Sequence, residues 1–245
     1  MQGARLYQQV AEQLAAAIAA GDYPPGTRLP AERKLAERFE VSRPTIREAI
    51  IALEIAGCVE VKGGSGVYVV DADAGSFTAT DSDIGPFEIL QARIMFEGEA
   101  AGLAARQMSA EEIAELEQIL QEMIAENATE ATAEVADEKF HLQVARGTHN
   151  DAVVSVCEHL WQLRNNSSIS ARILEKVRQA GSKPRIEEHR KILNAIKNRD
   201  AEGARNAMRD HLQRVVQQLL DATEAEALEA ARREVNAARQ RFALP

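Results

Sequence analysis

The chain has 245 residues, of which 45% are hydrophobic and 4% aromatic, and its net charge at pH 7 is −9. A chain this acidic does not coat nucleic acid along its length, and its many alanines and leucines favour helices. The charge is uneven, because residues 1–70 carry eight basic and eight acidic side chains and the remainder carries all of the excess. Any contact with DNA must therefore come from a local cluster of arginines in the first 70 residues.

The two cysteines, Cys58 and Cys157, lie far apart and form neither a CxxC motif nor a disulfide framework. Isolated thiols are typical of a reducing compartment. The N-terminus has no apolar signal region, and no run of residues reaches the roughly 18 apolar positions typical of a membrane-spanning helix. We therefore expect a cytoplasmic protein with no membrane partner.

The first 70 residues contain three segments with helical periodicity, followed by two short alternating segments joined by a glycine-rich turn. Recurring apolar residues, bounded by proline or glycine, predict the helices, and period-two alternation predicts the strands of a hairpin. The predicted elements are helices over 5–20, 31–39 and from Ser42 to Gly57, and strands over 59–61 and 67–69. This arrangement predicts a winged helix-turn-helix over residues 1–70.

The third of these helices has the features of a DNA-reading element. Ser42 suits the N-cap, and an apolar stripe with i, i+3, i+4 and i+7 spacing follows it. Arg43 and Arg47 lie four residues apart and share another face near the helix start. An arginine fork can pair with guanine O6 and N7, while hydroxyls such as that of Thr45 reach phosphates. The alternative is a surface helix with solvated arginines. The stripe consists of Ile46, Ala49, Ile50 and Leu53.

Three segments, 29–33, 42–49 and 63–66, together resemble the DNA-binding domain of the GntR family of transcription regulators. The resemblance implies that arginines of the helices contact the operator and that the tip of the wing enters the minor groove. For Arg33 the alternative is a solvated charge at a helix start, and for Gly64 it is a plain turn glycine. The candidate DNA-binding residues are Arg33, Ser42, Arg43, Thr45, Arg47 and Gly64.

Residues 71–85 are small, polar and acidic, and we interpret them as a linker. Helical patterns fill the chain from Pro86 onward, and no strand pattern appears there. We expect an all-helical bundle over 86–235, a tail over 236–245, and hence a mainly α fold. A short heptad-like apolar seam in the last helix would pack across a dimer or on the same bundle. The predicted helices cover 86–107, 109–126, 131–147, 150–165, 168–180, 184–198 and 200–235.

Four side chains in the helical part could bind a metal ion. Asp137 and His141 lie four apart on one helix, His189 near the start of a later helix, and His211 midway along the last. One carboxylate and three imidazoles suit Zn²⁺, Ni²⁺ or Mn²⁺, although the spacing alone equally fits surface or core histidines. The segments around these four residues resemble the metal-binding pattern of the FCD effector domain, which defines the FadR branch of the GntR family. The resemblance implies one divalent ion per chain, with zinc expected and nickel or manganese as alternatives.

Arg93 lies four residues before Glu97, so an intrahelical ion pair is one interpretation of it. In FCD domains the arginine at this place grips a ligand carboxylate beside the metal, a role that a guanidinium fork suits. Segments 85–93 and 161–166 are similar to those of hexuronate-responsive repressors. Asn165 and Asn166 would then contact the hydroxyls of a sugar acid, or simply make a polar helix end.

These patterns predict a homodimeric repressor, with each winged helix reading one half of a pseudo-palindromic double-stranded DNA operator. A small carboxylate effector, expected to be a hexuronate or related sugar acid, would release it from the operator. The alternatives are a regulator that responds to another small hydroxy or keto acid, a sensor of the metal itself, and a metal-dependent enzyme. We find no candidate base or nucleophile tied to the metal pattern, so we do not expect an enzyme.

Overall fold

The computed structural model describes residues 5–62, 65–70, 84–128, 135–179 and 186–242, and the described side chains end at Asp221. The chain divides into two compact units, one of residues 1–85 with 220–245 and the other of residues 86–219. Of the expected linker, residues 71–83 lie outside the described part. None of the described helices has the length and apolar character that crossing a membrane would require.

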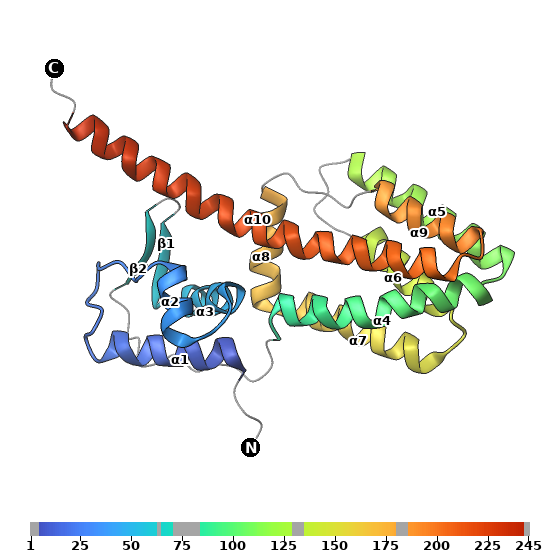
Figure 1. The fold of residues 1–245 in the computed structure, drawn as a ribbon, viewed down its shortest axis with the longest axis horizontal. Helices are drawn as coiled ribbons and strands as arrows, with labels where there is room; N and C mark the ends of the chain where they lie inside the picture. The colour runs from blue at the N-terminus through green and yellow to red at the C-terminus, as the bar shows by residue number, and fades with distance from the viewer. Residues whose placement is uncertain (1–4, 63–64, 71–83, 129–134, 180–185, 243–245) are drawn as a thin grey trace. The chain divides into compact units, whose positions relative to one another are not determined.

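Three helices and a hairpin make up the described secondary structure of residues 6–69 (Figure 1). Helix α3 packs against both α1 and α2, and the apolar stripe predicted for it is buried. Ser42 is the N-cap of α3, where its hydroxyl accepts a hydrogen bond from the Thr45 amide at 3.3 Å. The winged helix-turn-helix is therefore confirmed. Its elements are α1 (Leu6–Ala19), α2 (Glu32–Phe39), α3 (Arg43–Ile55), β1 (Val59–Lys62) and β2 (Gly66–Val69).

The two strands pair antiparallel, from Val59 opposite Val69 to Lys62 opposite Gly66. Gly66 has a φ of +121°, and a side chain there would collide with the guanidinium of Arg28. Both facts favour glycine at the end of the turn. The expected minor-groove residue of this wing, Gly64, lies outside the described residues.

The second unit is helical throughout its described residues, and each predicted helix has a counterpart. Ser109 and Glu112 form a reciprocal cap at the start of α5, with N···O distances of 2.7 and 3.2 Å. The last helix continues to Phe242 instead of ending at 235, and the side chains of its expected apolar seam lie outside the described ones. The helices are α4 (Pro86–Gln107), α5 (Ala110–Ala128), α6 (Val135–Arg146), α7 (Asp151–Asn166), α8 (Ser168–Gln179), α9 (Ile186–Lys197) and α10 (Ala201–Phe242).

Helix α4 is central to this unit, because it contacts α6, α7 and α9. It also lies along the first part of α10, where glycines allow close approach (Figure 1). A Cβ at Gly98 would lie only 2.8 Å from a carbon of Arg209, while Glu99 binds Arg205 and Arg209 at 2.8 and 2.9 Å. These contacts fix α10 against α4.

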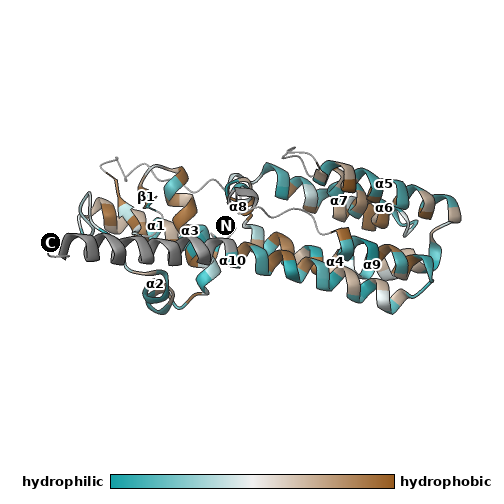
Figure 2. Cartoon of the chain, turned by 90° about the horizontal axis from the view of Figure 1, so that it is seen from above, coloured by the Kyte–Doolittle hydropathy of each residue, from teal (hydrophilic) through white to brown (hydrophobic). Residues whose placement is uncertain are grey.

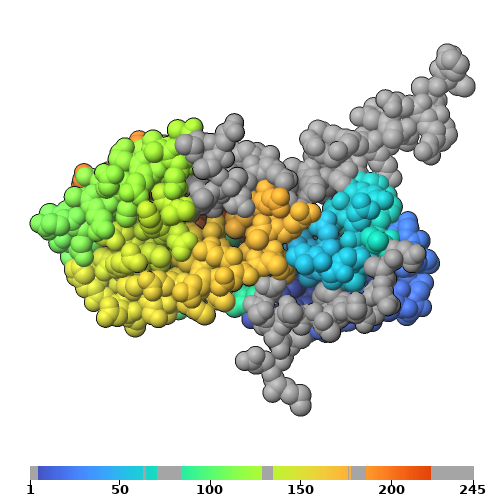
Figure 3. Space-filling model, turned by 180° about the vertical axis from the view of Figure 1, so that it is seen from behind, coloured from blue at the N-terminus to red at the C-terminus, as the bar shows by residue number. Residues whose placement is uncertain are grey.

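The helices carry hydrophilic and hydrophobic faces in alternation, as the teal and brown bands of Figure 2 show. Their apolar faces bury a core that includes Phe140 and Trp161, both with no exposed surface. Seen from behind, α5, α7 and α8 form the near surface of the unit (Figure 3). The metal-ligand candidates lie on α6, α9 and α10, within this helical framework.

Candidate metal centre and DNA-reading helix

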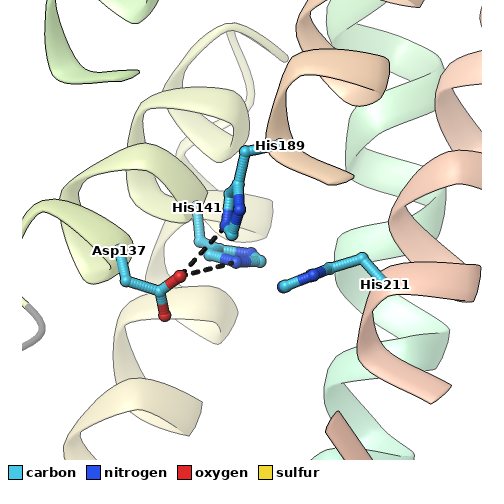
Figure 4. Close-up of side chains that lie close together, drawn as sticks. All are labelled: Asp137, His141, His189 and His211. Atoms are coloured by element: carbon cyan, nitrogen blue, oxygen red, sulfur yellow. Dashed lines mark ion pairs between the residues drawn. The ribbon is translucent and has the colours of Figure 1, made fainter. Parts of the chain in front are cut away.

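The four expected ligands come together from three helices. Asp137 and His141 lie one turn apart on α6, His189 comes from α9 and His211 from α10. One potential ligand atom from each lies within 4.8 Å of the others. Figure 4 shows the four side chains pointing toward a common centre. Helices α9 and α10 lie far from α6 in the sequence. The packing of these helices against one another therefore creates the cluster.

Burial sets the protonation of the cluster. His141, His189 and His211 are 1%, 0% and 5% exposed. Burial lowers the pKa of His211 to about 4, although its hydrogen bond to Glu188 raises it, and burial likewise lowers the pKa of His141. These two imidazoles are therefore neutral at pH 7, with a lone pair available for a metal ion.

The carboxylate of Asp137 is ionised despite its burial. Burial alone would raise its pKa, but the hydrogen bond from His189 and the neighbouring imidazoles lower the pKa overall. The Oδ1 atom lies 3.0 Å from Nε2 of His189 and 3.9 Å from Nε2 of His141. The cluster therefore combines one anionic oxygen with imidazole nitrogens, a donor set that zinc, nickel and manganese accept.

The Nε2 atom of His141 is buried and has no hydrogen-bond partner among the described residues. A buried polar atom without a partner costs free energy, and in native proteins it requires an explanation. Here the atom belongs to the four-ligand cluster, where a bound cation would satisfy its lone pair. The residues present thus fit a divalent metal ion.

A second layer of carboxylates orients two of the imidazoles. Nδ1 of His141 lies 2.6 Å from Oε2 of Glu97. Glu97 is ionised, because the charge of Arg93 and the hydrogen bonds from His141 and Arg93 lower its pKa to about 2 against the opposing effect of burial. A carboxylate only accepts hydrogen bonds, so Nδ1 must carry the proton and Nε2 must present its lone pair.

His211 is held in the same way on the other side of the cluster. Its Nδ1 lies 3.0 Å from Oε2 of Glu188, and the other oxygen of Glu188 lies 2.6 Å from Nε of Arg214. Each of these histidines therefore contacts a carboxylate through Nδ1, and each carboxylate in turn pairs with an arginine. Such outer partners raise the basicity of a metal-binding imidazole and fix its orientation.

The expected DNA-binding side chains differ in how accessible they are. Arg43, at the start of α3, keeps a side chain that is 51% exposed. Arg33 is exposed and pairs with Glu37 at 2.8 Å. Ser42 and Thr45 bond each other through their hydroxyls at 2.7 Å at the helix tip.

Arg47 is the exception, because only 3% of it is exposed. Its Nε donates to Oε2 of Glu32 on α2 at 2.9 Å, while Nη2 of Arg43 lies 3.9 Å from the same oxygen. The expected base contact by Arg47 therefore requires a change in its pairing with Glu32.

Two known families match this chain, one in each unit. Residues 6–69 match the family of bacterial regulatory proteins named gntR, and residues 88–214 match the FCD domain. The chain belongs to the GntR family. It is a DNA-binding transcription regulator with an FCD domain, and not an enzyme.

Several curated relatives of this GntR regulator align over most of their length. It is 39% identical to the "Uxu operon regulator" of Haemophilus influenzae, over 91% of this chain and 85% of the relative. It is 38% identical to the "Uxu operon transcriptional regulator" of Escherichia coli, over 89% and 88%, and 36% identical to the "Exu regulon transcriptional regulator" of that organism, over 89% and 86%. Among solved structures, "Streptococcus agalactiae GntR" is 27% identical over 85% of this chain and 98% of that one, with a TM-score of 0.45.

The expected effector-binding residues of this regulator occupy different environments. Arg93 is buried and makes the predicted ion pair with Glu97, donating from Nε at 2.6 Å and from Nη2 at 3.2 Å. Asn165 and Asn166 are exposed at the end of α7, and Asn165 donates to Glu138 at 3.0 Å. Arg93 is thus linked to His141, an expected metal ligand, through Glu97, whereas the two asparagines lie at the surface.

The two carboxylates that contact the histidines of the cluster, Glu97 and Glu188, were not predicted as site residues. The pairing of Glu97 with Arg93 was predictable from their spacing, but its second contact depends on how α4 packs against α6. Glu188 was visible only as the residue before His189, and neighbours on a helix point in different directions. Nothing in the sequence indicates that Glu188 reaches His211.

Proposed function

We propose that this GntR regulator represses genes of hexuronate use and is released from its operator by a hexuronate or related sugar acid bound at the metal site. The observation that carries the proposal is the buried cluster of Asp137 and three histidines, joined through Glu97 to Arg93. The similarity to relatives named for Uxu and Exu control supports the class of gene and of acid.

Asp137, His141, His189 and His211 would hold one divalent ion, with zinc expected and nickel or manganese as alternatives. A bound ion would supply a Lewis-acidic position for a carboxylate or hydroxyl oxygen of the acid.

Arg93 would hold the carboxylate of the acid. Its pair with Glu97 uses Nε and Nη2, so the Nη1 side of the guanidinium takes no part in that pair. A guanidinium has five N–H donors, enough to serve two carboxylates at once. Glu97 would then hold the side chains of Arg93 and His141 in fixed positions relative to each other while the acid binds.

DNA recognition would use Arg43 and its neighbours at the tip of α3 in the major groove, with two copies of the chain on a pseudo-palindromic operator. An exposed apolar surface on α4 supports a homodimer. Phe96 and Leu103 lie seven residues apart on one face and are 45% and 36% exposed, and Met95 beside them is 62% exposed.

The test combines metal analysis, calorimetry with hexuronates and an operator gel shift on the same preparations. His141→Ala should lower metal content and acid affinity together, because the site is shared. Arg93→Lys keeps a positive charge beside Glu97 but loses the fork, so it should retain the metal and weaken the acid. Metal-free protein that binds the acid with undiminished affinity would refute the shared site. Release from DNA by metal alone would make the metal itself the signal.

A further inference from the structure

Trp161 on α7 is the only tryptophan of the chain and has no exposed surface. The guanidinium carbon of Arg93 lies 4.0 Å from the centroid of its ring, and that of Arg164 lies 4.8 Å away. The ring of His141 lies 5.5 Å from the indole, centroid to centroid. The indole is therefore next to both the arginine expected to hold the acid and a ligand of the expected metal.

The indole Nε1 of Trp161 is buried and has no hydrogen-bond partner among the described residues. An indole N–H only donates, and the guanidiniums over the ring also only donate. The nearby carboxylate of Glu97 already accepts from Arg93 through both oxygens and from His141 through one. None of the groups identified around the ring accepts a hydrogen bond from this N–H in the described structure.

Two neighbouring rings, the indole of Trp161 and the imidazole of His141, each have a buried nitrogen without a hydrogen-bond partner among the described residues. Nε2 of His141 presents a lone pair without a cation, and Nε1 of Trp161 presents a proton without an acceptor. A metal ion satisfies the first, and an oxygen-rich anion bound next to it satisfies the second. A buried donor usually finds a partner in protein, water or ligand, so the missing acceptor is informative.

We propose that Trp161 is an effector-binding residue whose indole N–H donates a hydrogen bond to an oxygen of the bound acid. This inference rests on the proposed acid site and adds a requirement to it. The acid must offer an acceptor oxygen to the indole as well as a carboxylate to Arg93. A hydroxyl-rich sugar acid satisfies both.

The native protein can be tested directly, because a single tryptophan gives a single indole signal. In zinc-loaded protein labelled with ¹⁵N-tryptophan, D-glucuronate or D-galacturonate should shift the indole proton downfield and slow its exchange with solvent. Calorimetry on the same sample establishes that the site is saturated. An indole signal that stays in place at saturation overturns the inference.

A second test removes the N–H and keeps the shape of the ring. Replacing tryptophan throughout by 3-benzothienylalanine alters only position 161. Loss of one hydrogen bond, whether neutral or charge-assisted, should lower the hexuronate affinity about 3- to 100-fold. Zinc content and thermal unfolding should be unchanged. Trp161→Phe provides a genetically encoded second variant.

The outcomes separate this inference from the proposed function. Wild-type protein that binds neither hexuronate in the presence of zinc refutes the proposed effector and this inference together. Wild-type protein that binds the acid, with equal affinity in the isostere, refutes only the role of Trp161. Loss of zinc in the isostere also overturns the inference, because the ring would then act on the metal site.

Discussion

Replacing Glu97 by glutamine should weaken both metal and acid binding, because this carboxylate contacts His141, an expected metal ligand, and Arg93, the expected acid-binding residue. It is 1% exposed and accepts hydrogen bonds from Arg93 at 2.6 and 3.2 Å and from Nδ1 of His141 at 2.6 Å. A glutamine amide keeps one acceptor oxygen, turns its NH₂ group toward donors and loses the negative charge.

The expected magnitudes follow from these contacts. Loss of an outer partner of a metal-binding histidine typically costs about 10- to 100-fold in metal affinity, or about 1.4 to 2.8 kcal/mol. Leaving the buried guanidinium of Arg93 without its counter-ion should lower the free energy of unfolding by about 3 to 5 kcal/mol. Metal affinity would be measured by competition with a chelator, and stability by urea unfolding of metal-free protein.

Glu188→Gln is the matched control. Glu188 supports His211 as Glu97 supports His141, but its arginine, Arg214, has a side chain that is 48% exposed. The control should lose metal affinity to a similar degree and lose much less stability. At saturating metal it should bind the acid normally, whereas Glu97→Gln should not. Equal acid affinities in the two variants, or wild-type unfolding of Glu97→Gln, would refute the reasoning.

Three further outcomes are expected. Arg43→Ala should cost about 1 to 3 kcal/mol of specific operator binding in a gel shift at fixed salt without changing thermal unfolding, and normal binding would exclude Arg43 from base contact. Because the pKa of His211 is about 4 when folded and 6.5 ordinarily, the unfolded chain takes up the proton first as pH falls. Metal-free protein should therefore lose about 3 kcal/mol of stability between pH 6.5 and 4, and an unchanged pH dependence in His211→Gln would contradict this. Phe96→Glu should convert the expected dimer to monomer in light scattering at micromolar concentration, and a persistent dimer would place the interface elsewhere.

The helices could be predicted because each carries a long amphipathic pattern with recognisable ends. Local spacing also placed Asp137 and His141 on one face of α6, and it paired Arg93 with Glu97. In each case the partners are four residues apart, so the geometry of a single helix determines their relation.

Contacts between helices could not be predicted in the same way. Arg47 has the spacing of a groove-reading residue, yet Glu32, fifteen positions earlier, holds its side chain in the described structure. The partnership of Glu188 with His211 likewise depends on how α9 and α10 pack. Sequence periodicity indicates which face of a helix is buried, but it does not specify the side chain opposite.

Glu97 would make the two proposed binding functions of the FCD domain, for the metal and for the acid, interdependent. Arg93, Glu97 and His141 form a continuous chain of hydrogen bonds from the expected acid contact to an expected metal ligand. If an acid moves Arg93, Glu97 must adjust, and the imidazole that it orients must adjust with it. Binding free energies are reciprocal, so any factor by which the metal strengthens acid binding is also the factor by which the acid strengthens metal binding. A regulator built on this chain of contacts would respond to the acid most strongly when its metal site is filled.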